Sequence, residues 1–200
     1  MVSFEKNKTA SNFGDILNVY CKQRNCGIPS ISLLKKLFDP PKLDKIKVVM
    51  WGKGHEKVAL QRLTSEYGIK VSPTGIWLHE CGFLGATRDG LVGDNAIVEV
   101  KCPYSFRNDD LIDVLSEKSD YVVKFDRGDC VVNKNHPYYH QIQGQLHLTK
   151  RVLCYFVLWS TKSMVVLNVL IEPSWSSNIC VLKKFYCDHF IPDVKEMCPA

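Results

Sequence analysis

The stretch Asp89-Gly-Leu-Val-Gly-Asp-Asn-Ala-Ile-Val-Glu-Val-Lys-Cys-Pro103 decides both the expected fold and the expected site. Its opening Asp-Gly pair is typical of a tight turn, and Ala96 to Lys101 is typical of a strand that ends before the proline. Because side chains alternate along a strand, Glu99 and Lys101 share one face. A carboxylate in the turn, with a carboxylate and an ammonium group on the strand, is an arrangement that can hold a divalent metal.

The spacing Asp-x9-Glu-x-Lys is typical of metal-dependent nucleases, and two simpler interpretations compete with it. Glu99 and Lys101 could form a same-face salt bridge, which contributes only about 0–1 kcal/mol when it is exposed. Buried in a sheet, the same pair is costly without further partners, and this favours a functional explanation. The other acid-x-Lys triplet, Asp193-Val-Lys195, has no Asp-Gly turn before it and is interpreted as surface.

Length and composition predict one domain over residues 1–200, since 200 residues that are 46% hydrophobic suffice for a full core. No apolar run approaches the ~20 residues that cross a bilayer. Met1 to Lys8 lacks the apolar centre of a secretory signal. We therefore expect an intracellular protein of the nucleus or cytoplasm, neither secreted nor bound to a membrane.

The nine cysteines include no Cys-x-x-Cys pair. Disulfide frameworks belong mostly to shorter secreted chains, so we expect reduced and mostly buried thiols. A structural zinc site is the minor alternative.

The net charge of +5 is unevenly distributed. Residues 1–62 carry 12 Lys and Arg against 5 Asp and Glu, whereas residues 63–200 carry 14 against 16. A basic first third beside a carboxylate site suits a polyanionic substrate. A solvated basic surface is the alternative that charge alone leaves open.

The start of the chain predicts a helix that Thr9 or Ser11 caps. Its apolar residues recur at helical spacing: Phe13, Ile16, Leu17 and Tyr20. The free amides at such a helix start can bind a phosphate, although most helix caps bind nothing.

A long helix is expected from about Lys45 to Tyr67, and it contains Gly52 and Gly54. Each glycine costs about 1 kcal/mol relative to alanine in a helix. They are easier to explain if a ligand must approach the backbone there. Glu56 could then face the metal site, although a helix glutamate is more often solvated.

The remaining segments complete an α/β pattern. We expect short strands at Thr74–His79 and Phe83–Thr87, a helix and a hairpin between Tyr104 and Asn135, a helix from Pro137 with Gln141 and Gln145 on a polar stripe, strands at Val152–Trp159 and Met164–Ile171, and a final helix at Ser176–His189. The predicted fold is a mixed central sheet flanked by helices, with the Glu99 strand at its centre.

Four motifs occur in a fixed order: Thr9-Ala-Ser11, Trp51-Gly-Lys-x-x-Glu56, Asp89-Gly with Glu99-x-Lys101-Cys-Pro, and Tyr139-x-Gln141-x-Gln143. Together they resemble the PD-(D/E)XK restriction-endonuclease-like nucleases. More narrowly, they resemble the lambda-type exonucleases, the YqaJ-like viral recombinase family. The resemblance implies a Mg²⁺-dependent deoxyribonuclease, a 5′-to-3′ double-strand DNA exonuclease of recombination or repair. A structure-selective or general endonuclease on this scaffold and a DNA-binding module without catalysis are the alternatives.

The resemblance also implies roles for residues. Asp89, Glu99 and the Val100 carbonyl would ligate Mg²⁺, for which Mn²⁺ can substitute, and Glu56 would hold it directly or through water. Lys101 would orient or help to deprotonate the attacking water and stabilise transition-state charge. Gln141 would position that water or the lysine.

The resemblance also implies residues that bind DNA, and in this region the sequence differs from the family pattern at two places. Ser11 with Thr9 would receive a terminal 5′-phosphate, and Lys53 and Arg88 would contact DNA phosphates. Arg88 stands where the family has proline, and residues 4–8 lack the arginine that grips the phosphate in relatives. Lysines could replace it as point charges, or a short N-terminal piece is missing. Relatives act on double-stranded ends beside a strand-annealing protein and form ring-shaped homotrimers, so these are the expected partners.

Overall fold

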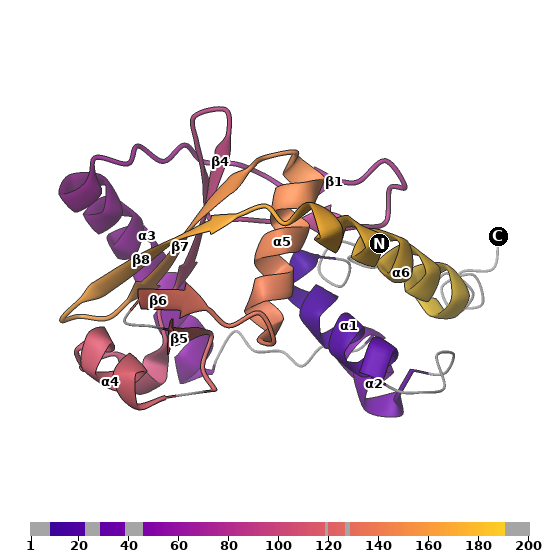
Figure 1. Ribbon diagram of the computed structural model, residues 1–200, viewed down its shortest axis with the longest axis horizontal. Coiled ribbons are helices and arrows are strands. Elements are labelled where there is room, and N and C mark those ends of the chain that lie inside the picture. The colour runs from indigo at the N-terminus through magenta and orange to yellow at the C-terminus, as the bar shows by residue number, and fades with distance from the viewer. Residues whose placement is uncertain (1–8, 23–28, 39–45, 119, 127–128, 191–200) are drawn as a thin grey trace.

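The central sheet of the computed structural model is mixed, as predicted (Figure 1). The structure describes residues 9–22, 29–38, 46–118, 120–126 and 129–190. The strand order is β3-β4-β7-β8. The strands are β3 (Gly90–Val92), β4 (Ala96–Lys101), β7 (Leu153–Trp159) and β8 (Met164–Leu170). β4 pairs antiparallel with β3 and parallel with β7, and β7 pairs antiparallel with β8.

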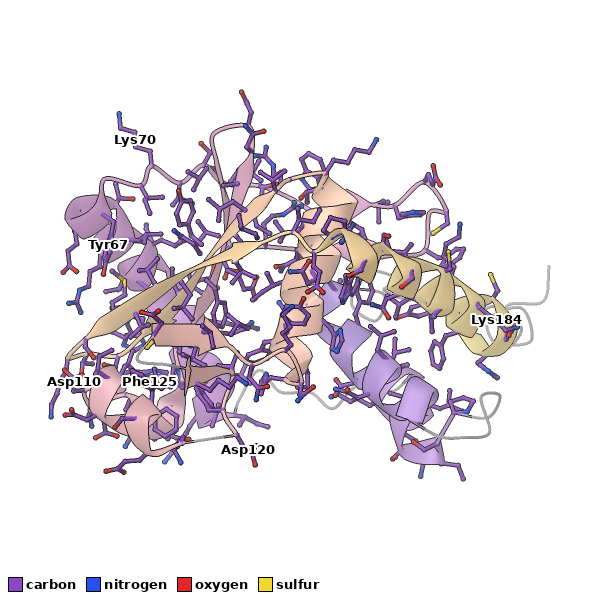
Figure 2. All side chains as sticks on the ribbon, in the orientation of Figure 1. Tyr67, Lys70, Asp110, Asp120, Phe125 and Lys184 are labelled. Carbon is purple, nitrogen blue, oxygen red and sulfur yellow. The ribbon has the colours of Figure 1, made fainter. Side chains whose placement is uncertain are left out.

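Helix α3 (Lys47–Tyr67) covers one face of this sheet. Ala59 and Leu63 of α3 pack in one core with Val98 and Val100 of β4. The helix ends at Gly68, whose φ of 69° lies in the left-handed region that glycine adopts without strain. Side chains near this end of α3 and Lys184 lie at opposite ends of the molecule (Figure 2).

The opposite face is covered by the segment that connects β4 to β7. It comprises η2 (Tyr104–Phe106), α4 (Leu111–Glu117), β5 (Val123–Asp126), β6 (Asp129–Val132) and α5 (Pro137–Thr149). β5 and β6 form an antiparallel hairpin, so the helix and hairpin predicted between 104 and 135 are confirmed. The core on this face contains Ile97, Leu115, Ile142, Leu146 and Phe156.

A second helical layer packs on the far side of α5 (Figure 1). It contains η1 (Ala10–Asn12), α1 (Phe13–Lys22), α2 (Ile31–Phe38), η3 (Pro173–Ser176), α6 (Ser177–Phe185) and a π-helical turn (Tyr186–Phe190). A Cβ on Gly14 would lie 2.5 Å from Pro137 Cα, and one on Gly144 would lie 2.5 Å from Phe13 Cδ2. These glycines therefore let α1 and α5 approach closely, and α5 is buried on both sides.

Several expectations need correction. The predicted strands at 74–79 and 83–87 shrink to β1 (Trp77–Leu78) and β2 (Gly85–Ala86), because these strands pair with each other over two residues and, within the described ranges, do not join the main sheet. Thr9 stands at the N-cap of η1, but its hydroxyl lies 2.7 Å from that of Ser11 and caps no backbone amide. The six cysteines whose side chains the structure describes are free, but the expectation that most are buried is wrong: Cys102 and Cys154 are buried, whereas Cys81 and Cys130 are partly buried and Cys180 and Cys187 are exposed.

The second acid-x-Lys triplet, residues 193–195, lies outside the described residues. Among the described helices, none is both long enough and apolar enough to cross a membrane.

Candidate active site

The predicted pair on β4 does face α5, and α5 supplies its partner. Lys101 Nζ lies 2.5 Å from Glu99 Oε1, and Gln141 Nε2 donates to the same oxygen at 2.5 Å. Gln141 Oε1 in turn lies 3.4 Å from Lys101 Nζ. Glu99 is only 3% exposed. The salt bridge is therefore buried at Glu99 and partly buried at Lys101, and it belongs to a network, which is the case that favours a functional explanation.

Gln145 is a member of this network to which the sequence analysis gave no role. Its Nε2 donates to Glu99 Oε2 at 2.7 Å and to the Thr87 carbonyl at 2.7 Å. Thr87 lies two residues before Asp89, so one side-chain amide joins the turn to the strand. The available signal was the placement of Gln141 and Gln145 one helical turn apart on the same stripe.

Asp89 is held against the edge of β4. Its Oδ2 accepts a hydrogen bond from the Val100 amide at 2.6 Å, and its own amide donates to the Val98 carbonyl at 3.2 Å. Burial, and then the neighbouring Glu99 and Glu56 carboxylates, raise the pKa of Asp89 to about 8, although the Val100 amide opposes the shift. The turn thus places the Asp89 carboxyl group in a buried position near Glu99 and Glu56, where its ionisation is unfavourable.

Glu56 and Lys101 take part in the same electrostatic environment. Burial, and then Glu99, raise the pKa of Glu56 above its ordinary value. Burial acts to lower the pKa of Lys101, but the contact with Glu99 outweighs it and leaves the pKa raised. Lys101 therefore carries its positive charge at neutral pH.

The chemistry of these residues suits a hard divalent cation. In the described part of the chain, no three His, Cys, Asp or Glu side chains converge closely enough to form a ready metal site. However, Asp89, Glu99 and Glu56 are oxygen donors, and burial and then repulsion between these carboxylates raise the pKa of Asp89 and of Glu56. A bound cation relieves this repulsion, and oxygen ligands are those that Mg²⁺ prefers.

The predicted phosphate-binding residues lie in different environments. Thr9 is buried and forms a bridge with Gly85, whereas Ser11 is exposed. Lys53 is exposed on α3. Arg88 is only 6% exposed, its guanidinium carbon lying 4.9 Å from the Trp77 ring centroid. Burial, and then the charge of another arginine, lower the pKa of Arg88 to about 10.

A pocket of about 300 Å³ opens beside the network. It is lined by Val48, Val49, Gly52, Lys53, Glu56, Val100, Lys101, Cys102, Pro103, Tyr121 and Tyr138. A Cβ on Gly52 would meet nothing within 4 Å, so packing within the described protein does not require a glycine there. This agrees with the expectation that the backbone of α3 is kept open for approach.

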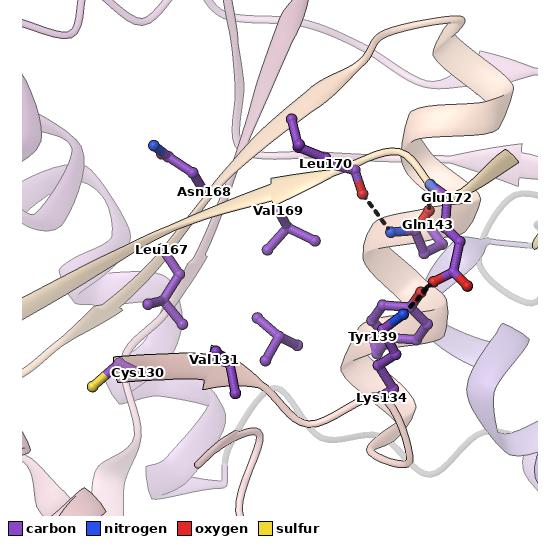
Figure 3. A pocket seen from close by; sticks show the side chains of 11 residues that line it. Cys130, Val131, Lys134, Tyr139, Gln143, Leu167, Asn168, Val169, Leu170 and Glu172 are labelled. Carbon is purple, nitrogen blue, oxygen red and sulfur yellow. Dashed lines mark hydrogen bonds and ion pairs between the residues drawn. The ribbon is translucent and has the colours of Figure 1, made fainter. Parts of the chain in front are cut away.

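A different pocket, of about 240 Å³, lies between β6, β8 and α5 (Figure 3). At its edge the Glu172 carboxylate accepts from Lys134 at 2.7 Å and from the Tyr139 hydroxyl. Gln143 Nε2 donates to the Leu170 carbonyl, and Gln143 Oε1 accepts from the Glu172 amide, both at 2.9 Å. These bonds tie the end of β8 to α5, so we interpret this cluster as structural.

Comparisons with known proteins agree with the fold. The crystal structure of LHK-Exo in complex with dAMP matches with a TM-score of 0.66 and 19% identity, over 96% of this chain and 91% of that one. The alkaline exonuclease LHK-Exo from Laribacter hongkongensis gives 0.57 and 20%, over 95% and 94%. A phage-related exonuclease from Haemophilus somnus 129PT gives 0.62 and 15%, over 93% and 95%.

Comparison with curated protein sequences gave no match. A family model, however, matches residues 5–152, which include the described members of the Glu99 network and Glu56. This chain belongs to the YqaJ-like viral recombinase domain family.

Proposed function

We propose that this protein is a Mg²⁺-dependent 5′-to-3′ double-strand DNA exonuclease. The observation that carries the proposal is the buried network in which Glu99 binds Lys101, Gln141 and Gln145 beside Asp89. Membership of the viral recombinase family and the exonuclease folds of the structural neighbours support it.

Each residue of the network has a task in phosphodiester hydrolysis. Asp89, Glu99 and the Val100 carbonyl would hold Mg²⁺, with Glu56 contributing from α3. When bound, Mg²⁺ lowers the pKa of water and offsets the charge on the leaving 3′-oxygen. Lys101, charged and fixed by Glu99, orients the attacking water and stabilises the negative charge that develops on the phosphate. Gln141 hydrogen-bonds to both Lys101 and Glu99 and fixes the orientation of the two side chains.

The DNA end would be held on the side of the basic first third of the chain. We propose that Thr9 and Ser11 receive the terminal 5′-phosphate and that Lys53, at the pocket beside Lys101, contacts the strand. A phosphate contact by Arg88 requires its buried guanidinium to become accessible. Action beside a strand-annealing protein, and a homotrimer around the duplex, complete the proposal.

The deciding experiment is Mg²⁺-dependent digestion of end-labelled linear duplexes, with and without a 5′-phosphate, and of closed circular DNA. We expect mononucleotides released from the 5′-labelled end, faster digestion with the phosphate, and intact circles. Loss of circles would indicate an endonuclease. Binding of DNA without hydrolysis would indicate a module without catalysis, and activity that persists in Lys101→Ala would exclude the mechanism.

A further inference from the structure

The pocket beside Lys101 has two chemically different walls. One carries the groups assigned to hydrolysis, Glu56, Val100 and Lys101, with Lys53 alongside. The other carries Tyr121 and Tyr138, which come from the segment between β4 and β7. Its volume of about 300 Å³ suits one small ligand with a polar end and a flat apolar end.

The aromatic wall is part of a connected cluster that fixes its rings. Tyr121 meets Phe106 edge-on at 5.3 Å between centroids and His136 at 6.2 Å. His136 meets Tyr138 at 4.7 Å. Lys101 Nζ lies 4.5 Å from the centroid of the Tyr138 ring. A chain of ring contacts therefore runs from the hairpin region to Lys101, and it presents rigid rings at little cost in conformational freedom.

Charge separates the two sides of Tyr121. On the pocket side lie Lys53 and Lys101, which attract a phosphate and outnumber the single carboxylate of that lining, Glu56. Tyr121 also lines a second hollow, together with Phe106, Glu117, Lys118 and Asp120. There two carboxylates outnumber the one lysine, Lys118, so a phosphate is favoured on the Lys101 side.

We infer that this pocket is a nucleotide subsite, in which one DNA base stacks on the wall of Tyr121 and Tyr138 while its phosphate lies at Lys101. The inference rests on the proposed function and adds the element that holds the base. Stacking on aromatic side chains tolerates every base, because each has a π-face. The subsite therefore binds a nucleotide next to the cleaved bond without selecting its sequence.

The test compares Tyr121→Leu with Tyr121→Phe on duplexes whose 5′-terminal or next nucleotide is intact or abasic. On intact DNA, Tyr121→Leu should raise KM about tenfold, and Tyr121→Phe should recover most of that loss because it keeps the ring. With an abasic residue in the subsite, the two variants and the wild type should have the same KM. Phe125→Leu changes an exposed aromatic residue of the hairpin that follows Tyr121, and it is the matched control with unchanged activity.

Two outcomes would overturn the inference while leaving the proposed function intact. One is a Tyr121→Leu defect of equal size on intact and abasic DNA, which indicates a structural role. The other is no defect on either. Absence of hydrolysis by the wild type would instead count against the proposed function.

A measurement on the wild-type protein covers the case in which Tyr121→Leu does not fold. Duplexes carry 2-aminopurine at the first or second nucleotide and are bound in EDTA, where hydrolysis does not occur. Stacking on tyrosine should lower the fluorescence at one of these positions and leave an interior position unchanged. Increased fluorescence at both positions would mean that the base is freed without a ring to stack on, and the subsite would be rejected.

Discussion

Glu99 and Glu172 are both carboxylates held by several donors, yet their surroundings differ in kind. The Glu99 side chain is 4% exposed and bonds to Lys101, whereas that of Glu172 is 37% exposed and bonds to Lys134. Hydrogen bonds from Lys134 and then Tyr139 lower the pKa of Glu172 to about 2. Among the described residues, no carboxylate shifts the pKa of Glu172, whereas burial and then Glu99 raise the pKa of Asp89 to about 8.

The difference separates a structural carboxylate from one built for chemistry. The charge of Glu172 is compensated by its neighbours, so the cluster is complete as it stands. Around Glu99, burial and then the neighbouring carboxylates raise the pKa values of Asp89 and Glu56, and Lys101 offsets only part of the rise. A bound cation would stabilise the ionised form of these carboxyl groups, and this is why we propose a cation site here.

The largest expected effect that separates the two clusters comes from Asp89→Asn. Asparagine keeps an acceptor for the Val100 amide but removes the charge. We expect nuclease activity to fall about a thousandfold, the order found when one electrostatic group of a catalytic centre is removed. The melting temperature in EDTA should rise or stay unchanged, because a repulsive buried carboxylate is lost. A lower melting temperature with retained activity would place Asp89 in the structural class.

The next comparison uses two glutamines of α5. Gln145→Met removes the donor to Glu99 and to the Thr87 carbonyl, and we expect activity to fall about 10–100-fold with a higher Mg²⁺ requirement. Gln143→Met leaves the Leu170 carbonyl and the Glu172 amide without their partner, which should cost about 1–3 kcal/mol of stability. Steady-state kinetics and urea unfolding measure both. Equal loss of activity in the two variants would contradict the assignment of Gln145 to the catalytic network and of Gln143 to the structural cluster.

A smaller effect tests whether the open space beside the Glu99 network is used. Gly52→Ala and Gly54→Ala both add a methyl group that meets nothing within 4 Å in α3. Each should stabilise the helix by about 1 kcal/mol. Only Gly52 lines the pocket, so only Gly52→Ala should lower activity, by about tenfold or less. Unchanged activity in Gly52→Ala would show that substrate does not approach the helix there.

The smallest effect is in the pH dependence of unfolding, where the two clusters have opposite signs. Glu172 has a lowered pKa, so its contribution is present above its ordinary value of 4.5 and is lost as the pH falls towards 2. Asp89 has a raised pKa, so its contribution is present below 3.8 and is lost as the pH rises through 8.

Melting temperatures in EDTA between pH 2 and pH 9 measure both contributions. Glu172→Gln should weaken the acid-side fall, by under about 1 kcal/mol because the group is exposed. Asp89→Asn should weaken the fall towards pH 9. If Glu172→Gln instead weakens the fall in melting temperature towards pH 9, or Asp89→Asn weakens the fall in acid, the assignment of the two clusters is wrong.

Local patterns predicted the strand that carries the site. The strand Ala96–Lys101 was predicted with its observed bounds, because alternation and the preceding turn are properties of neighbouring residues. The same alternation placed Glu99 and Lys101 on one face. The contact of Gln141 with that face, by contrast, was expected only through the family resemblance.

Contacts between distant segments were not predictable from local pattern. Tyr121 reaches the pocket because the hairpin after α4 packs beside α5, and no periodicity in its own segment indicates this. Gln145 stood on a predicted polar stripe, but its partner Thr87 depends on how α5 crosses the sheet. The strands predicted at 74–79 and 83–87 are shorter than expected, because β-branched and aromatic residues favour a strand only over residues that have a partner, and β1 and β2 pair over two residues each.

The parallel pairing of β4 with β7 has a consequence for how the protein folds. Residues 102–152 must be looped out before Glu99 can pair with Phe156 on the neighbouring strand. Closing so long a loop costs chain entropy before any contact compensates, which makes such pairings slow. The same loop carries α5 and the aromatic wall, so catalytic competence and completion of the sheet should arise in a single late step of refolding. A nascent chain that ends before β7 would then contain every residue of the site but would have no nuclease activity.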